Sequence, residues 1–184
     1  METEFFVLTA VGPDRPGLMS AISDYVFARG GNVESSRAAT LGGEFAVVML
    51  VAINEAAADT LESQMGQLDR EGLTCTLRRT TAPRSHAATG AVAYTLSVQA
   101  MDHPGIVQAI THDLASMSVN IESLETQVES APHTGTSMFR FHARLTLPPN
   151  LKIATCRQKL VNLAKRFNFD LDLAEDEGTA VSGN

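Results

Sequence analysis

The sequence predicts an α+β protein made of two copies of one β-α-β-β-α-β unit in tandem. The first observation behind this prediction is an internal repeat, because a shift of 88 residues superimposes 5–35 on 93–123 without a gap. The second is the hydrophobic periodicity, which alternates between strand and helix in the same order in both copies. The chain is therefore predicted to be a duplicated fold.

Two short motifs carry the repeat. Asp-Arg-Pro-Gly at 14–17 falls on Asp-His-Pro-Gly at 102–105, and Asn-Val-Glu-Ser at 32–35 falls on Asn-Ile-Glu-Ser at 120–123. Chance could produce one such match, but two matches with an identical spacer indicate duplication.

In the first copy, apolar residues alternate at Phe6, Leu8 and Ala10, which predicts a half-buried strand. Helical spacing follows the Pro-Gly turn, and Gly42-Gly43 predicts the turn of a hairpin. A second helix and a short strand complete the copy. The expected elements after the first strand are a helix over 18–26, strands over about 33–41 and 45–53, one helix over 58–68 and a strand over 73–77.

The second copy repeats this order with a longer hairpin loop, which contains Pro132-His133-Thr134-Gly135. Its outgoing hairpin strand alternates cleanly, with Phe139 and Phe141 inward and Arg140 and His142 outward. The expected elements are a strand over 94–100, a helix over 106–117, the outgoing strand over 139–147, a helix over 153–167 and a strand over 169–173.

This element order is the split β-α-β arrangement of ferredoxin-like domains, which closes into a four-stranded antiparallel sheet with both helices on one face. Residues 79–90, between the copies, show no hydrophobic period and are rich in small, polar and breaker residues. The domains are therefore expected as follows: a first domain over 1–80, a linker over 81–91, a second domain over 92–175 and a disordered tail over 176–184.

The first copy carries apolar side chains on both faces of its central strands. Those on the face away from the helices are Phe5, Val7, Val11, Val48, Leu50 and Ala52. Exposing such a stripe to water is unfavourable by roughly 25 cal/mol per Å² of apolar surface. The linker or the other half of the chain could cover it, and the sharper expectation is a homodimer.

Charge and composition exclude several classes of protein. The 184 residues carry 14 Lys and Arg against 21 Asp and Glu, a net charge of −7, so direct nucleic-acid binding is not expected. The longest uncharged apolar stretch, 45–53, is too short to cross a membrane. The acidic N-terminus does not suit a targeting peptide, and Cys75 and Cys156 form no metal or redox pair, which favours a cytoplasmic protein.

The Asp-x-Pro-Gly turn permits two interpretations. In the structural one, Asp14 caps the following helix, Pro16 lies in its first turn and Gly17 allows a close backbone approach. In the functional one, free N–H groups at the helix start bind a carboxylate while a nearby Asp or Asn accepts from an ammonium group. These groups would hold a zwitterionic amino acid, although the Asp charge also repels an incoming carboxylate.

Asn32 and Asn120 each lie sixteen residues after the proline of the turn, at the entry to the second strand. As a structural residue, each would be a left-handed helix exit, a conformation that Asn tolerates. As a ligand residue, each could both donate and accept hydrogen bonds. The sequence leaves both interpretations open.

The repeated Asp-x-Pro-Gly-[Leu/Ile] and Asn-[Val/Ile]-Glu-Ser segments resemble the ACT domain family of small-molecule regulatory modules. A free-standing pair of this length resembles the glycine cleavage system transcriptional repressor family, and the resemblance covers roughly 4–174. It implies a regulator without enzymatic activity or cofactor, which binds a small, glycine-like amino acid at ACT interfaces. It also implies contact with a DNA-binding regulator protein rather than with DNA.

The resemblance also implies an effector site, formed by the loop after the first strand and the Asn at the start of the second. Its residues would be Gly12, Asp14, Arg15, Gly17 and Asn32 in the first copy, and Ala100, Asp102, His103, Gly105 and Asn120 in the second. Some ACT sensors have Asn where this chain has Asp14 and Asp102.

Catalysis and metal binding find little support. The two cysteines have no identifiable partner base, and the histidines, at 86, 103, 112, 133 and 142, follow no metal-ligand spacing. Formyltetrahydrofolate deformylases resemble this chain in starting with an ACT domain, but here a second ACT-like unit occupies the space of a catalytic domain. RNA-recognition modules share the strand order, but neither third strand has their basic aromatic motif.

Basic residues flank the apolar stripe of the last predicted helix. They are Lys152, Arg157, Lys159, Lys165 and Arg166. A solvated helix face is the ordinary explanation, and docking onto an acidic protein partner is the alternative. For the whole chain, the alternative to an amino-acid sensor is a ligand-free structural or oligomerisation module.

Overall fold

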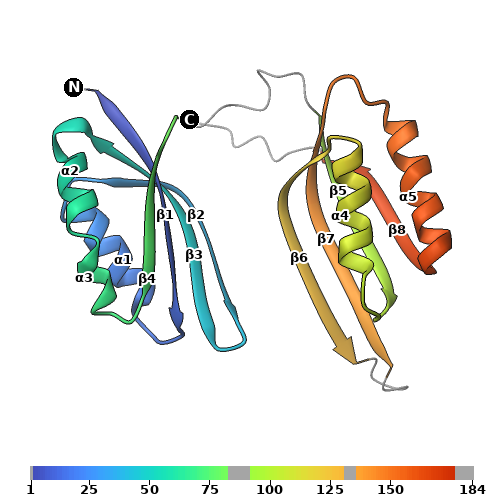
Figure 1. Cartoon of the computed structure of the whole chain (residues 1–184), viewed down its shortest axis with the longest axis horizontal. Coiled ribbons are helices and arrows are strands. Elements are labelled where there is room, and N and C mark those ends of the chain that lie inside the picture. The colour runs from blue at the N-terminus through green and yellow to red at the C-terminus, as the bar shows by residue number, and fades with distance from the viewer. Residues whose placement is uncertain (1, 83–91, 131–135, 177–184) are drawn as a thin grey trace. The chain divides into compact units, whose positions relative to one another are not determined.

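The computed structural model of the chain describes residues 2–82, 92–130 and 136–176. The chain divides into two compact units, Met1–Pro83 and Arg84–Asn184. Each unit has a hydrophobic core of its own (Figure 1). The predicted linker from residue 83 onward, the hairpin loop at 131–135 and the predicted tail from residue 177 lie outside the described residues.

The first unit is a four-stranded antiparallel sheet with the strand order β2-β3-β1-β4. Its elements are β1 (Thr3–Pro13), α1 (Leu18–Phe27), β2 (Asn32–Leu41), β3 (Glu44–Asn54), α2 (Glu55–Ser63), α3 (Gly66–Asp69) and β4 (Thr74–Thr80).

The second unit repeats this topology, with the strand order β6-β7-β5-β8. Its elements are β5 (Val92–Met101), α4 (Ile106–Ser116), β6 (Asn120–Ser130), β7 (Ser137–Leu147), α5 (Ile153–Phe167) and β8 (Phe169–Glu175). The predicted fold class, two ferredoxin-like units in tandem, is confirmed.

In each unit the helices lie on one face of the sheet, as Figure 1 shows. The alternation predicted for the first strand is confirmed, because Phe6, Leu8 and Ala10 are fully buried beneath the helices. In β7, Phe139 and Phe141 are buried while Arg140 is exposed, also as predicted. The side-chain period of two along each strand therefore separates the core face from the outer face.

The single helix predicted over 58–68 is wrong, because the chain breaks there into α2 and the short α3. Around the break, Met65 N–H donates to Glu62 O and Leu68 N–H donates to Met65 O, a tighter pattern than that of an α-helix. Gly66, a poor helix former, lies at this point. The predicted apolar stripe still faces the core, since Ala58, Leu61 and Leu68 are buried.

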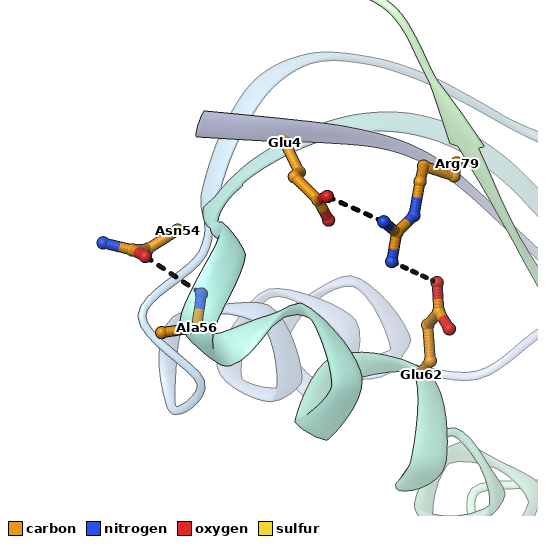
Figure 2. A network of polar contacts seen from close by, with 5 residues as sticks. All are labelled: Glu4, Asn54, Ala56, Glu62 and Arg79. Carbon is orange, nitrogen blue, oxygen red and sulfur yellow. Dashed lines mark hydrogen bonds and ion pairs between the residues drawn. The ribbon is translucent and has the colours of Figure 1, made fainter. Parts of the chain in front are cut away.

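Polar contacts tie α2 to the sheet (Figure 2). Asn54 caps α2, because its side chain accepts a hydrogen bond of 3.0 Å from Ala56 N–H. Arg79 of β4 pairs with Glu4 of β1 at 2.7 Å and with Glu62 of α2 at 3.5 Å. These contacts join two strands and a helix at one end of the first sheet.

The outer faces of the two sheets differ in chemistry. On the first sheet most outward residues of β1 and β3 are apolar, and Val11 and Val48 are 46% and 44% exposed. Thr9, also outward, has its hydroxyl within 2.6 Å of the Thr76 hydroxyl, so this polar group is satisfied within the face. On the second sheet the register places Ser97 and His142 at the equivalent level. The duplicated fold thus has one apolar and one polar outer face.

No helix in the described ranges is both long enough and apolar enough to cross a membrane.

Gly12, near the end of β1, packs against the turn before β4. A Cβ at Gly12 would lie 2.4 Å from Gly72 O, closer than carbon and oxygen can approach. The equivalent position in the second unit is Ala100, which is buried in its core. Gly12 is thus required by a close backbone contact that the second unit does not share.

We predict that Gly12→Ala lowers the free energy of unfolding by about 1–3 kcal/mol, because the added methyl group overpacks a backbone contact. Urea denaturation followed by circular dichroism measures the effect. Gly66→Ala is the control, since its Cβ would lie 3.7 Å from the nearest atom, Asp69 Oδ2. An unchanged midpoint for Gly12→Ala would contradict the packing argument.

Candidate functional site

A left-handed glycine begins the first helix of each unit. Gly17 is the N-cap of α1 with φ 94°, and Gly105 is the N-cap of α4 with φ 96°. The interpretation that Asp14 caps the helix is therefore wrong, and so is its counterpart for Asp102. Because of the positive φ of the glycine, the helix begins only at the residue after it. The Asp, three residues before the glycine, therefore does not occupy the N-cap position.

The start of each helix carries no side-chain cap. The first intrahelical hydrogen bonds run from Ala21 N–H to Gly17 O and from Ala109 N–H to Gly105 O, both at 2.9 Å. The N–H groups of residues 18–20 and 106–108 therefore have no helical partner. These N–H groups can donate to a carboxylate or another small anion, which the partial positive charge of the helix end also favours.

The Asp residue of each turn is anchored through its backbone and keeps its side chain exposed. Asp14 N–H donates to Gly43 O and Asp102 N–H donates to Ser137 O, each at 2.9 Å. These bonds tie the turn to the hairpin between the second and third strands. An exposed carboxylate beside the helix start can accept from an ammonium group.

The residue after the Asp contacts a different segment in each unit. In the first unit this segment follows α3, and in the second unit it is the end of α5. Arg15 Nη2 donates to Glu71 O at 3.1 Å and pairs with the Glu71 carboxylate. The His103 ring stacks on Phe167, with 5.8 Å between ring centroids and 10° between planes. Arg15 and His103 thus make contacts within their own units.

Gly12 and Ala100 have no exposed side chain, so each could contact a ligand only through its backbone atoms. Gly12 lies against Gly72, and Ala100 is 4% exposed within the core.

A solvent-open surface pocket, called the cavity below, lies at the second turn beside α4 and has a volume of about 550 Å³. It is lined by the turn itself, by Val107 and Thr111 of α4, and by Val128 and Phe139 of the neighbouring hairpin. Because Gly105 has no side chain and nothing lies within 4 Å of where its Cβ would be, the helix start remains open to this cavity. The cavity is large enough for a small metabolite.

Asn32 and Asn120 are the first residues of β2 and β6. The helix-exit interpretation of these residues is wrong, because the positive φ angles belong to Gly30, at 75°, and to Ser118, at 57°. The Asn32 side chain donates to Glu34 Oε1 at 2.8 Å, and Asn120 donates to Glu122 Oε1 at 2.6 Å. The Glu of the repeated Asn-x-Glu-Ser motif therefore positions the amide, which leaves the amide oxygen to accept.

The strand register separates the turn from the Asn within one unit. In the first sheet, Asn32 pairs with Ala52, and Ala52 pairs with Phe5 near the start of β1. Gly12, at the turn, pairs with Phe45 at the other end. The seven residue steps from Phe5 to Gly12 span about 23 Å of strand. One unit therefore does not bring the two halves of the expected site together.

The register of the second unit has the same consequence. Asn120 pairs with Thr146, which pairs with Ala93 at the start of β5, whereas Ala100 pairs with Phe139 at the turn. The expected residues thus form four separate clusters, two turns and two Asn-Glu pairs.

Groups for catalysis or metal binding are sparse in the described part of the chain. No group of three or more His, Cys, Asp or Glu side chains there could hold a metal ion. Burial raises the pKa of both the Cys75 and the Cys156 thiols. Each therefore stays protonated at neutral pH, the less nucleophilic form.

Some supporting residues were missed by the sequence analysis. Glu34 and Glu122 stand inside a repeated motif, so the repeat itself could have indicated their role. Glu71 and Phe167 belong to parts of the chain where the two copies no longer match, and no sequence signal connects them to the turns.

Comparison with known proteins gives a family and a set of relatives. The ACT domain family matches residues 4–77 of the chain. The glycine cleavage system transcriptional repressor of Escherichia coli K12 is 27% identical over 165 residues, which cover 89% of this chain and 86% of that protein. The Shigella flexneri protein of the same name matches equally well.

Two solved structures match nearly the whole chain. A protein of unknown function from Galdieria sulphuraria is 33% identical, with a TM-score of 0.83 over 95% of this chain and 99% of that one. A candidate glycine cleavage system transcriptional repressor is 23% identical, with a TM-score of 0.68 over 95% and 98% of the two chains, and this likeness shows the fold.

We predict that Gly17→Ala and Gly105→Ala each lower the free energy of unfolding by about 1–2 kcal/mol, because alanine is strained in the left-handed backbone conformation. The loss should not be larger, since no atom lies within 4 Å of the added Cβ. Thermal and urea denaturation measure the loss. Gly17→Asn should cost less than Gly17→Ala, since Asn tolerates this conformation. Equal losses for Ala and Asn would contradict the assigned backbone geometry.

Proposed function

The chain is a tandem ACT-domain protein that resembles the glycine cleavage system transcriptional repressors, and from this premise we propose that it is a non-enzymatic regulator that binds a small, glycine-like amino acid. The uncapped, glycine-started helix at each turn carries the proposal. Its N–H groups at 18–20 and 106–108 suit the α-carboxylate. Asp14 or Asp102 beside it suits the α-ammonium group.

The ammonium group can offset the repulsion between the Asp and the ligand carboxylate. A zwitterion brings both charges, so the cation lies beside Asp14 or Asp102 while the anion lies at the helix start. A simple carboxylate lacks the cation and would meet the repulsion alone. This difference favours amino acids over other small acids.

We propose that a complete site also uses an Asn supplied by a different ACT unit from the one that supplies the turn. The support is the strand register, which holds Asn32 about 23 Å from its own turn. Ligand binding would then favour one arrangement of units over another, which is how a bound effector shifts an equilibrium.

The output of the regulator is proposed to be contact with another protein, a DNA-binding regulator, in the cytoplasm. The relationship to a glycine cleavage system transcriptional repressor supports a role in transcription. The net charge of −7 argues against direct contact with nucleic acid. Contact with a DNA-binding partner reconciles the two observations.

We also propose that the chain forms a homodimer in which a second copy covers the apolar outer face of the first sheet. The polar outer face of the second sheet supports this, because it has the composition expected of the same fold when water covers it. The alternative function is that of a ligand-free structural module. Such a module would need only the apolar outer face, as a contact surface.

Titration calorimetry separates the sensor from the structural module. We expect glycine, or another small amino acid such as serine, to release or absorb heat with the purified chain, and Asn32→Ala or Asn120→Ala to weaken that binding. Both Asn side chains are exposed, so the melting temperature should stay nearly unchanged. Arg37→Ala, on the same strand as Asn32, is the control. No heat with any amino acid, and no thermal shift, would support the structural module.

The homodimer is tested by placing a charge on the apolar outer face. We expect Val48→Lys to lower the mass measured by sedimentation equilibrium, because a buried ammonium group without a partner is unfavourable. His142→Lys, at the equivalent position of the second sheet, should leave the mass unchanged. An unchanged mass for Val48→Lys would remove the proposed interface.

A further inference from the structure

The segment of α5 is strongly basic within an acidic chain. From Lys152 to Phe167 it carries five Lys and Arg residues and no Asp or Glu, whereas the whole chain has a net charge of −7. A helix with this surplus of positive charge is a candidate interaction surface.

The basic residues of this segment have no acidic partner among the described residues. Arg157 donates to Leu173 O at 2.7 Å, and Lys159 donates to the Ser116 hydroxyl. Arg166 lies over the Phe167 ring at 5.0 Å, and Lys165 and Lys152 are exposed. Their positive charges therefore stay uncompensated within the described parts of the unit.

The equivalent segment of the first unit has the opposite charge. From Glu55 to Asp69, α2 and α3 carry four acidic residues and no Lys or Arg. Glu62 pairs with Arg79 at 3.5 Å, whereas Glu55, Asp59 and Asp69 form no ion pair with any described residue. The two copies of one fold have thus become oppositely charged at the same helical position.

We infer that α5 of one copy of this chain docks against α2 and α3 of a second copy. Charge complementarity points to this occupant, because Glu55, Asp59 and Asp69 of the chain's own α2 and α3 form no ion pair with a described residue. The contact differs from the proposed dimer through the apolar sheet face, since α2 and α3 lie on the opposite side of that sheet (Figure 1). It also does not depend on amino-acid binding.

The contact should be weak and sensitive to salt. Exposed ion pairs each change an affinity by less than about fivefold, so several must act together. Salt weakens the total attraction of these ion pairs, because the Debye length falls from about 30 Å at 0.01 M ionic strength to about 3 Å at 1 M. Self-association through α5 should therefore be present at the lower ionic strength and lost at the higher one.

Sedimentation velocity of the full chain at these two ionic strengths tests the inference. The weight-average mass should rise at low ionic strength, and the double variant K165E/R166E should abolish that rise. The variant R140E/R144E is the control for net charge, since it makes the same change on the polar outer face of the second sheet. A low-salt mass that K165E/R166E leaves unaltered, or that R140E/R144E lowers equally, would overturn the inference.

A charge swap gives the sharper test. The variant E55K/D59K should also lose the low-salt rise. An equimolar mixture of E55K/D59K with K165E/R166E should regain it, because both pairings between the two variants, native with native and reversed with reversed, join a basic to an acidic surface. No recovery in the mixture would contradict docking between α5 and α2. Glycine titration of each variant by calorimetry keeps this outcome separate from the proposed ligand site.

Other occupants of α5 give different results. A DNA fragment that binds the chain at low ionic strength, and is released by K165E/R166E while the mass of the protein alone stays constant, would replace self-docking with nucleic-acid binding. A mass that stays constant at both ionic strengths in every variant would also reject a second copy as the occupant.

Discussion

The backbone conformation of one glycine per unit is the constraint on which the account depends. Gly17 and Gly105 both adopt a left-handed conformation at the N-cap, which delays the helix and leaves its first N–H groups without a cap. A capping side chain in their place would satisfy those groups internally. The same two glycines thus set the start of the helix, expose the donors and keep the adjacent space free of a side chain.

The two units share the left-handed glycine but differ in other features. Both units retain the turn, the Asn-Glu pair and the strand order, whereas the outer sheet face is apolar in one and polar in the other. The second helices have diverged to opposite charges. The features of the proposed ligand site are therefore common to both units, whereas the outer sheet face and the charge of the second helix differ between them.

The fold could be predicted because periodicity reports which side chains are buried, as with Phe6, Leu8 and Ala10. The break at Gly66 and the N-cap glycine were not predicted, because the apolar stripe continues across the break and an Asp before the helix also suits an N-cap. The Asn side chains were grouped with the turns in one expected site, and only the strand register reveals that about 23 Å of strand separates them within a unit. Contacts such as Arg15 with Glu71 join segments remote in sequence and carry no sequence signal.

In the proposed site, uncapped N–H groups behind a left-handed glycine hold the carboxylate of an amino acid. Amide NMR spectra recorded during a glycine titration observe these groups individually. We expect saturable shifts in the backbone amides of residues 18–20 or 106–108, beyond those of the rest of either helix. Saturable binding with shifts confined to other parts of the chain, or no shift at all with any small amino acid, would contradict the proposed site.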